Sequence, residues 1–346
     1  MNEFGIGILA TSHYLPGNIQ TNEELCKHLT DTSPEWILEK TGIKKRHFVS
    51  EGETASSMAV TTCKAILEKT GITAKDLGLI VVASFSQDYL FPPMSAKIHK
   101  DLGASKDCQV FDINANCTGL VTATTLAAER MQFNPDIKYA LVVGVEVLSR
   151  FTNKADKDTA IFFSDGASAV LLGKVRNGYG LITSKFSTDS STYESVRMRG
   201  GGSTHAKFGR EYATEVDYIE QNGLATWKQA VTNLPPVITS VVKQANLTIP
   251  EIDFVVFHQA NNNLINYILK KLKIPEERTF NNVEEIGNTG SASIGIALSE
   301  AFNSGKVRHD SYLLLAGVGA GFNFGANIWK IDIVPPDITM VGDSIV

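Results

Sequence analysis

Short apolar runs alternate with longer segments of helical periodicity along most of the chain. Four of these runs are rich in Val, Ile and Leu and stop at small or polar residues: Leu79–Ser84, Tyr139–Val147, Phe254–Phe257 and Tyr312–Gly317. Continuous apolar runs of this length are typical of strands that are buried on both faces, and the segments between them are typical of helices that cover those faces. The pattern therefore predicts an α/β fold.

This pattern occurs twice at nearly the same spacing. Aligning Asp76–Ser84 with Glu251–Gln259 brings Tyr139 close to Tyr312. A helix-like segment precedes each tyrosine and a glycine-containing strand follows it; the four segments are Cys117–Met131, Phe163–Leu172, Ser291–Phe302 and Gly321–Lys330. Matched order and spacing favour an internal duplication.

The duplication suggests how the chain is divided. We expect two similar α/β halves, residues 1–178 and 179–346, that separate near Gly178–Gly180 and contribute catalytic groups to a common junction. Segment Ser187–Arg210 contains GGG and few large apolar residues, so it predicts a long surface excursion that either lines a pocket or is mobile. The tail Pro335–Val346 follows a Pro-Pro break and is expected to add little to the core.

Composition narrows the class of protein. The chain has 346 residues, of which 43% are hydrophobic, enough for one large core or two fused smaller ones. Lys and Arg total 32 against 37 Asp and Glu, so the net charge gives no general attraction to nucleic acid. The first residues lack a basic segment followed by an apolar run, and no stretch reaches the roughly 18 apolar residues of a membrane span. We expect a cytoplasmic enzyme without a membrane segment or a nucleic-acid partner.

The four cysteines, Cys26, Cys63, Cys108 and Cys117, are widely spaced and form no CxxC pair, which disfavours a disulfide scaffold and a zinc site. Cys117 differs from the others because it lies in DINANCTG, where a strand ending near Ile113 leads into a helical segment. A helix N-terminus lowers a thiol pKa from about 8.5 to roughly 3.5–7.5 in favourable cases. We predict that Cys117 is a nucleophile with a lowered pKa and that the other three are structural.

Two polar residues of the second half occupy comparable positions. His258 directly follows the run FVVF and precedes a new helix, so it sits at a strand end from which it can reach a cleft. Asn288 lies in IGNTGSASIGIAL, on a glycine-flanked turn that opens the helix paired in the repeat with the Cys117 helix. Taken alone, a histidine such as His258 is more often a structural group, and Asn288 would be interpreted as a helix N-cap.

Taken together and in this order, the motifs NANCTG, HQANN and GNTGSASIG resemble the Cys-His-Asn centre of β-ketoacyl-acyl carrier protein synthase III. The resemblance spans most of the chain, because it includes TSPEWILEKTGIKKRHF near the start, FPPMSA, FFSDGASA and, near the end, GVGAGFNFG. It implies a thiolase-like fold in which two duplicated α/β halves form a layered α-β-α-β-α core.

The chemistry that the resemblance implies assigns a role to each residue. An acyl group moves from a thioester to Cys117, while the backbone N–H groups of Cys117 and Ala320 form the oxyanion hole. A malonyl-type thioester then loses carbon dioxide, and His258 Nε2 and the Asn288 amide stabilise the enolate that attacks the acyl-cysteine. Neither a metal nor another cofactor is implied.

The resemblance also implies the partners. The substrates are acyl-coenzyme A or an acyl-carrier protein together with malonyl-carrier protein, and the protein is a homodimer in which Phe91 reaches the neighbouring subunit's acyl pocket. Trp36 is placed against the coenzyme A adenine and Asn261 at the substrate. Lys40 and Lys157 are also assigned to substrate binding, although they stand where the family usually has arginines for coenzyme A.

The carrier-protein contact departs from the family pattern. Two residues after the asparagine of the HQAN motif the family commonly has an arginine, whereas this chain has Asn263. Lys270 and Lys271 on the same predicted helix are the alternative contacts with an acidic carrier protein, and a solvated helix face explains them equally well.

Several alternatives share part of this pattern. A specialised-metabolite condensing enzyme or acyltransferase acting on carrier-bound acyl groups would use the same triad. A thioester hydrolase would share the acylation step, whereas an inactive partner subunit would be expected to lack Cys117. SASIG at Ser291–Gly295 and GDSI at Gly342–Ile345 suggest a serine hydrolase, but the first lacks the leading glycine and the second lies in the tail. A nicotinamide-binding turn is disfavoured because Phe322 ends GVGAGF.

Overall fold

The structure is a computed structural model that describes residues 4–205 and 214–333. The tail Pro335–Val346, with the GDSI motif at Gly342–Ile345, lies outside these residues, as does part of the segment Ser187–Arg210. Within the described ranges, no helix combines the length and the apolar character needed to cross a lipid bilayer.

The larger sheet is built from the first half of the chain. Its five strands occur in the order β1 (Phe4–Tyr14), β7 (Asp165–Arg176), β6 (Tyr139–Val147), β4 (Leu77–Ala83) and β5 (Gln109–Ile113). β4 runs parallel to β5 and β6, whereas β7 runs antiparallel to β6 and β1. Nearly every residue of β4 and β6 is buried, as their continuous apolar sequences predict.

The smaller sheet repeats this arrangement with the second half of the chain. Its strands are, in order, β8 (Gly180–Thr188), β13 (Asn323–Lys330), β12 (Tyr312–Gly319) and β11 (Phe254–Phe257). β11 and β12 are parallel and the other pairs are antiparallel, so these strands correspond to β1, β7, β6 and β4. At the position that β5 occupies in the larger sheet, an isolated parallel bridge joins Val255 to Thr279.

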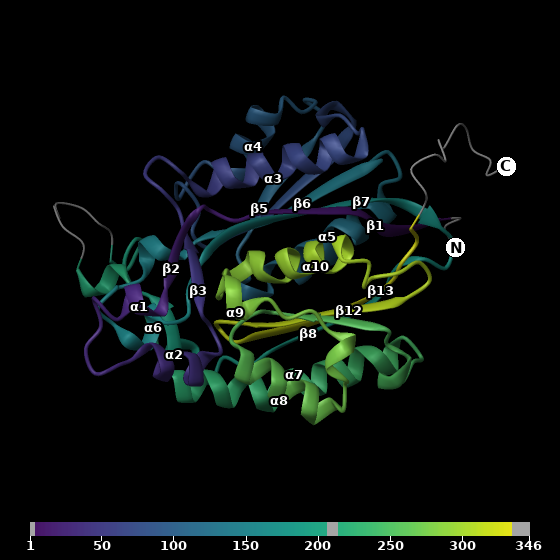
Figure 1. The fold of residues 1–346 in the computed structure, drawn as a ribbon. Helices are drawn as coiled ribbons and strands as arrows, with labels where there is room; N and C mark the ends of the chain where they lie inside the picture. Colours follow the sequence, from purple (N-terminus) through teal and green to yellow (C-terminus); the bar gives the residue numbers. More distant parts are fainter. Residues whose placement is uncertain (1–3, 206–213, 334–346) are drawn as a thin grey trace.

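Five layers stack through the molecule (Figure 1). The outer helices of the larger sheet are α3 (Ala55–Thr70) and α4 (Met94–Leu102), those of the smaller sheet are α7 (Gly223–Gln244) and α8 (Asn262–Leu272), and the two between the sheets are α5 (Gly119–Phe133) and α10 (Ser293–Asn303). α5 and α10 bury most of their residues because a sheet covers each side of them. This order confirms the predicted α-β-α-β-α core of an α/β thiolase-like fold.

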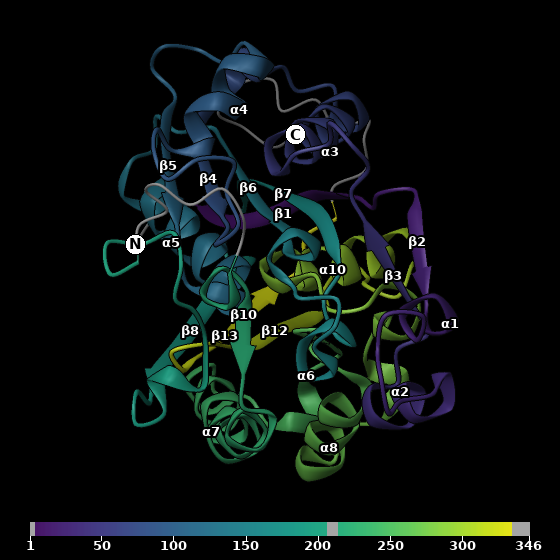
Figure 2. The same ribbon diagram turned by 90° about the vertical axis from the view of Figure 1, so that its left-hand side faces the viewer.

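Shorter elements flank these layers (Figure 2). β2 pairs with β3 near the first helices, and the elements along this edge are β2 (Asn18–Thr21), α1 (Asn22–Leu25), α2 (Pro34–Thr41), β3 (Lys45–Phe48), α6 (Lys157–Ala160) and α9 (Val283–Ile286). A second pair joins β9 (Val196–Met198) to β10 (Ile219–Gln221). β9 belongs to the segment Ser187–Arg210 and lines the central cavity, so for this part the pocket-lining alternative is the one that the structure supports.

Candidate active site

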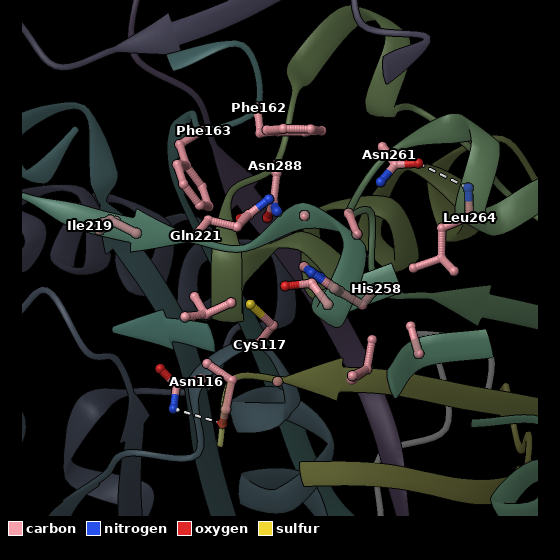
Figure 3. Close-up of a pocket in the computed structure, with 18 of the residues that line it drawn as sticks. Asn116, Cys117, Phe162, Phe163, Ile219, Gln221, His258, Asn261, Leu264 and Asn288 are labelled. Carbon is pink, nitrogen blue, oxygen red and sulfur yellow. Dashed lines mark hydrogen bonds between the residues drawn. The ribbon is translucent and has the colours of Figure 1, made fainter. Parts of the chain in front are cut away.

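A cavity of about 390 Å³ opens where the two halves of the chain meet. Figure 3 shows Cys117, His258 and Asn288 projecting into it from three separate segments. The structure thus brings together the three residues that the motifs single out. Much of the remaining wall is apolar and includes Phe85, Leu148, Phe151, Phe162, Phe163, Val196 and Ile219.

Cys117 lies in η2 (Asn116–Thr118), a single turn of 3₁₀ helix directly before α5. The preceding residue, Asn116, has a φ of 49°, in the left-handed region that asparagine tolerates better than most side chains. Its Nδ2 donates to Ala320 O at 3.3 Å, which ties η2 to the second half of the chain. This turn leaves Cys117 half-buried, with its sulfur at the cavity.

The end of β12 packs directly against this turn. A Cβ added to Gly319 would lie 3.1 Å from Cys117 N and 2.8 Å from Ala115 O, so only glycine allows the two backbones to approach this closely. Ala320 follows and also borders the cavity. The backbones that carry the two predicted oxyanion-hole donors, Cys117 and Ala320, are therefore held side by side.

The predicted lowering of the Cys117 pKa is wrong. Burial raises the pKa of the thiol to about 12, and the negative charge of Glu146 acts in the same direction. A hydrogen bond from the Cys117 backbone N–H opposes this effect, but it does not offset the lost solvation of a thiolate. Cys117 is therefore a thiol at neutral pH, and its proton has to leave as the sulfur attacks.

His258 follows β11 and is fixed by two contacts. Its backbone N–H donates to Ala316 O at 2.8 Å, and its ring Nδ1 lies 2.7 Å from Ser293 Oγ, which also accepts the Gln259 N–H at 3.3 Å. Burial lowers the pKa of His258 to about 3, so the imidazole is neutral. Because a serine hydroxyl can donate or accept, Ser293 is compatible with Nε2 as either an acceptor or a donor toward the cavity.

Asn288 is held in one amide orientation. Its backbone N–H donates to Phe162 O at 2.9 Å, and its side-chain Oδ1 accepts the Gly290 N–H at 2.9 Å. The amide oxygen is therefore turned away from the cavity and occupied, which leaves Nδ2 as the group that can donate to a substrate oxygen. Asn288 is buried apart from its face toward this cavity.

The residues predicted around the triad separate into two groups. Lys40 and Asn261 line the cavity together with Ala320, and Asn261 caps α8 by accepting the Leu264 N–H at 2.9 Å. The other five lie elsewhere on the surface or in packing sites, and are Trp36, Phe91, Lys157, Lys270 and Lys271.

These more distant residues have distinct surroundings. Trp36 is half-buried against the cluster of Leu25, Leu29 and Ile37, and Lys157 is exposed on α6. Phe91 is 83% exposed, whereas Lys270 and Lys271 are exposed at the C-terminal end of α8. Their predicted substrate, subunit and carrier contacts stay predictions.

Asn263, which stands in place of the expected arginine, makes internal contacts. Its Nδ2 donates to Lys40 O at 2.8 Å and to Glu39 O at 3.1 Å, and thereby joins the start of α8 to the end of α2. Asn263 and Lys40 both line the cavity, so this link shapes one side of it.

The nicotinamide alternative and the SASIG form of the serine-hydrolase alternative fail on geometry, whereas GDSI lies outside the described residues. Ser291 has no exposed surface, and its Oγ lies 2.8 Å from Ala83 O and 2.6 Å from Glu146 Oε1 instead of facing the cavity. The glycine-rich turn at Ala320–Phe322 continues into β13, where a dinucleotide-binding turn would open a helix.

Sequence reasoning missed Ser293, Asn116 and Glu146. Each acts through a contact with a residue far away in the chain, which a local motif does not show. Asn116 and Ser293 do lie in the motifs NANCTG and GNTGSASIG, and Ser293 falls five residues after Asn288, so for these two a weak signal existed.

Family models match two long segments of the chain. The model described as 3-oxoacyl-[acyl-carrier-protein (ACP)] synthase III matches residues 111–190, and the model of the C-terminal part of the same family matches residues 242–331. These segments contain Cys117, His258 and Asn288.

Curated relatives match nearly the whole chain. The β-ketoacyl-[acyl-carrier-protein] synthase III of Wolbachia pipientis is 35% identical over 92% of this chain and 97% of its own length. The protein of the same name from Vesicomyosocius okutanii is 36% identical over 92% of this chain and 96% of its own length.

Solved structures give the same result. The 3-oxoacyl-[acyl-carrier-protein] synthase III of Aquifex aeolicus superposes with a TM-score of 0.85 at 33% identity, covering 94% of this chain and 100% of its own. The corresponding Thermus thermophilus enzyme gives 0.87 at 30% identity, over 95% and 100% of the two chains. The priming β-ketosynthase of a polyketide biosynthetic pathway gives 0.88 at 26% identity, over 96% and 98%. The sequences and the fold agree with the resemblance seen in the motifs, and the chain belongs to the β-ketoacyl-[acyl-carrier-protein] synthase III family.

Proposed function

We propose that the protein is an acyltransferase that condenses an acyl thioester with a malonyl thioester on a carrier protein and releases carbon dioxide. Family membership supports this transferase reaction, which is the one predicted from the motifs. The observation that carries the assignment of residues is the convergence of Cys117, His258 and Asn288 on one cavity between the halves.

In the first step the Cys117 sulfur attacks the thioester carbonyl. Because the thiol and the His258 imidazole are both neutral, the Cys117 proton passes to Nε2 as the carbon–sulfur bond forms, and then to the departing thiolate. Negative charge develops on the carbonyl oxygen, where the N–H groups of Cys117 and Ala320 are the proposed donors.

In the second step a carrier-bound malonyl group loses its carboxylate as carbon dioxide. The electron pair moves to the thioester oxygen, and the proposed donors to that oxygen are His258 Nε2–H and Asn288 Nδ2–H. The enolate carbon then attacks the acyl-cysteine carbonyl, and the Cys117 sulfur leaves and takes a proton from solvent. Ser293 supports both steps, because its hydroxyl can pair with either neutral tautomer of the His258 ring.

The substrates are proposed to enter along the cavity. Its apolar wall suits an acyl chain, and Lys40 and Asn261 lie beside the route to Cys117. We assign the adenine end of coenzyme A to the region of Trp36 and Lys157, and an acidic carrier protein to Lys270 and Lys271.

A homodimer is part of the proposal. Tyr89, Leu90 and Phe91 are 67%, 72% and 83% exposed, and three consecutive apolar side chains this accessible favour burial by another subunit. Phe91 is the residue that would reach the neighbouring acyl pocket.

The test is intact-mass analysis of the wild-type protein and Cys117→Ala with a panel of acyl-coenzyme A and acyl-carrier thioesters. We expect an acyl adduct on wild type alone, which malonyl-carrier protein discharges as a β-ketoacyl product with release of carbon dioxide. Discharge as free acid would point to a thioester hydrolase, and no adduct with any donor would point to a partner subunit.

A second candidate is a condensing enzyme that starts a specialised-metabolite pathway. The similarity to a priming β-ketosynthase of a polyketide pathway favours it. The same panel separates the two, because a priming enzyme of this kind would prefer unusual or carrier-bound acyl groups over short straight-chain acyl-coenzyme A.

A further inference from the structure

Glu146 lies at the end of β6 with no exposed surface, and the reaction proposed above gives it no role. It sits beneath η8 (Gly290–Ala292), the 3₁₀ turn that follows Asn288 and precedes α10. A Cβ added to Gly290 would lie only 2.9 Å from Glu146 Cγ. In the described part of the chain no cation pairs with Glu146, and a buried carboxylate without a cation is costly.

The two carboxyl oxygens of Glu146 share one donor, because the Phe85 N lies 3.3 Å from each of them, and their other partners differ. Oε2 lies 2.5 Å from Ser86 Oγ and 3.4 Å from Ser84 Oγ, just after the end of β4. Oε1 lies 2.6 Å from Ser291 Oγ, and Ser291 Oγ lies 2.8 Å from Ala83 O. Glu146 therefore joins the end of β4, in the first half of the chain, to η8, in the second half.

Counting hydrogens favours a protonated Glu146. Ser86 Oγ accepts the Val147 N–H at 2.8 Å, so its own hydrogen is free to be donated to Glu146 Oε2. Ser291 has one hydroxyl hydrogen but two close oxygen neighbours, Ala83 O and Glu146 Oε1. If Ser291 donates to Ala83 O, a hydrogen on Glu146 Oε1 is needed to make the 2.6 Å contact a hydrogen bond.

We propose that Glu146 is held as a neutral carboxylic acid that donates to Ser291, and that its ionisation slows acylation of Cys117 at alkaline pH. The neutral acid positions η8, whose Gly290 N–H in turn holds the amide of Asn288. It also keeps a negative charge away from the sulfur that must lose its proton. The kinetic part rests on the proposed acyl transfer to Cys117, whereas the protonation state does not.

The ionisable surroundings of Glu146 agree with this assignment. From η2 it faces Cys117, whose ionisation the charge of Glu146 opposes, while β4 and η8 present serines. On β7, which pairs with β6, the carboxylate of Asp165 is directed at Ser149 and the Val49 N–H. Burial raises the pKa of Glu146 to about 8, and His258, on the cavity side, is neutral.

The decisive variant is Glu146→Gln, whose amide oxygen and NH₂ group can take the places of Oε2 and of the protonated Oε1. The first measurement is infrared difference spectroscopy of the resting protein. We expect the carbonyl band of a protonated carboxyl group in wild type at pH 7, its loss as the pH rises past about 8, and its absence from Glu146→Gln. A wild-type spectrum at pH 7 without this band would overturn the proposal.

The second measurement is the rate of acyl-adduct formation on Cys117 between pH 6 and pH 9.5. In wild type we expect about a tenfold fall from pH 7 to pH 9, since the neutral fraction of an acid drops tenfold for each pH unit above its pKa. Glu146→Gln should stay within about twofold of wild type at pH 7 and lack this fall. The same fall in the variant, or loss of its activity at pH 7 with the fold intact, would contradict the proposal. Failure of wild type to form any adduct would instead refute the proposed function and leave the infrared result standing.

Discussion

Cys117 and Ser291 occupy equivalent places in the two halves of the molecule. Each is the middle residue of a 3₁₀ turn that opens an inner helix, η2 before α5 and η8 before α10. Each turn begins with a residue of positive φ, 49° at Asn116 and 54° at Gly290. The local backbone is thus nearly the same, yet the Cys117 sulfur lies at the cavity whereas Ser291 is buried against Glu146.

The first residues of the two turns show why the outcomes differ. Asn116 has space for a side chain, which reaches Ala320 O and helps hold η2 at the cavity. At Gly290 a side chain would collide with Glu146. The glycine lets η8 pack against the end of β4, where the Ser291 hydroxyl donates to Ala83 O. The same entry into a helix therefore carries the proposed nucleophile in one half and a buried supporting serine in the other, and the packing around each turn accounts for the difference.

Replacing the side chains at these two positions should give the largest difference in reaction rate. We expect Cys117→Ser to lower β-ketoacyl formation by at least about 10³-fold, because a serine in this buried site is a far weaker nucleophile than a thiol. Ser291→Ala, the matched change in the other half, should keep acyl-adduct formation within about tenfold of wild type. Adduct mass and product formation measure both. A Ser291→Ala protein that folds but forms no adduct would contradict the supporting role of Ser291.

A smaller effect is expected where the second turn reaches the substrate. Asn288→Asp replaces the Nδ2 donor with an acceptor, and one lost donor to a developing oxyanion typically costs about 10²–10³-fold in rate. Release of carbon dioxide from malonyl-carrier protein should fall by this factor, while acyl transfer to Cys117 falls much less. Asn303→Asp, at the exposed end of α10, is the control and should change neither rate. Equal losses in both steps would refute the division of roles.

The buried strands and the inner helices could be predicted from the sequence. The continuous apolar runs predicted β6 and β11 with the same first and last residues as in the structure. This was possible because a strand that is covered on both faces has an uninterrupted apolar sequence. They did not identify β1, whose sequence FGIGILATSHY mixes glycine and polar residues with its apolar ones. The three residues of the proposed triad could be singled out because their motifs are local, whereas the residues that support them make contacts with distant parts of the chain.

The Cys117 pKa shows most clearly what the sequence leaves out. The position of the residue before a helix was visible in DINANCTG, but the burial of its sulfur and the presence of Glu146 behind it were not. Both are consequences of tertiary packing, within the first half for Glu146, and together they reverse the direction of the pKa change. Local sequence therefore indicates where a thiol lies relative to a helix, but not its protonation state.

The smallest change, counted per pH unit, is expected in stability, again at the Ser291 turn. An unfolded glutamate ionises near pH 4.3, whereas burial raises the pKa of Glu146 to about 8 in the fold, so between these values folding must take up a proton. The free energy of unfolding contributed by Glu146 should accordingly fall as the pH rises from about 5 to 8, by on the order of 1 kcal/mol per pH unit, and level off above that range.

Glu146→Gln removes this dependence and leaves Asp165, the other buried carboxyl beside β6, unchanged. Thermal melts of the two proteins from pH 5 to pH 9 should therefore diverge in favour of the variant up to about pH 8. Parallel curves would mean that Glu146 is already ionised in the folded protein, and that Ser291 donates to it instead of to Ala83.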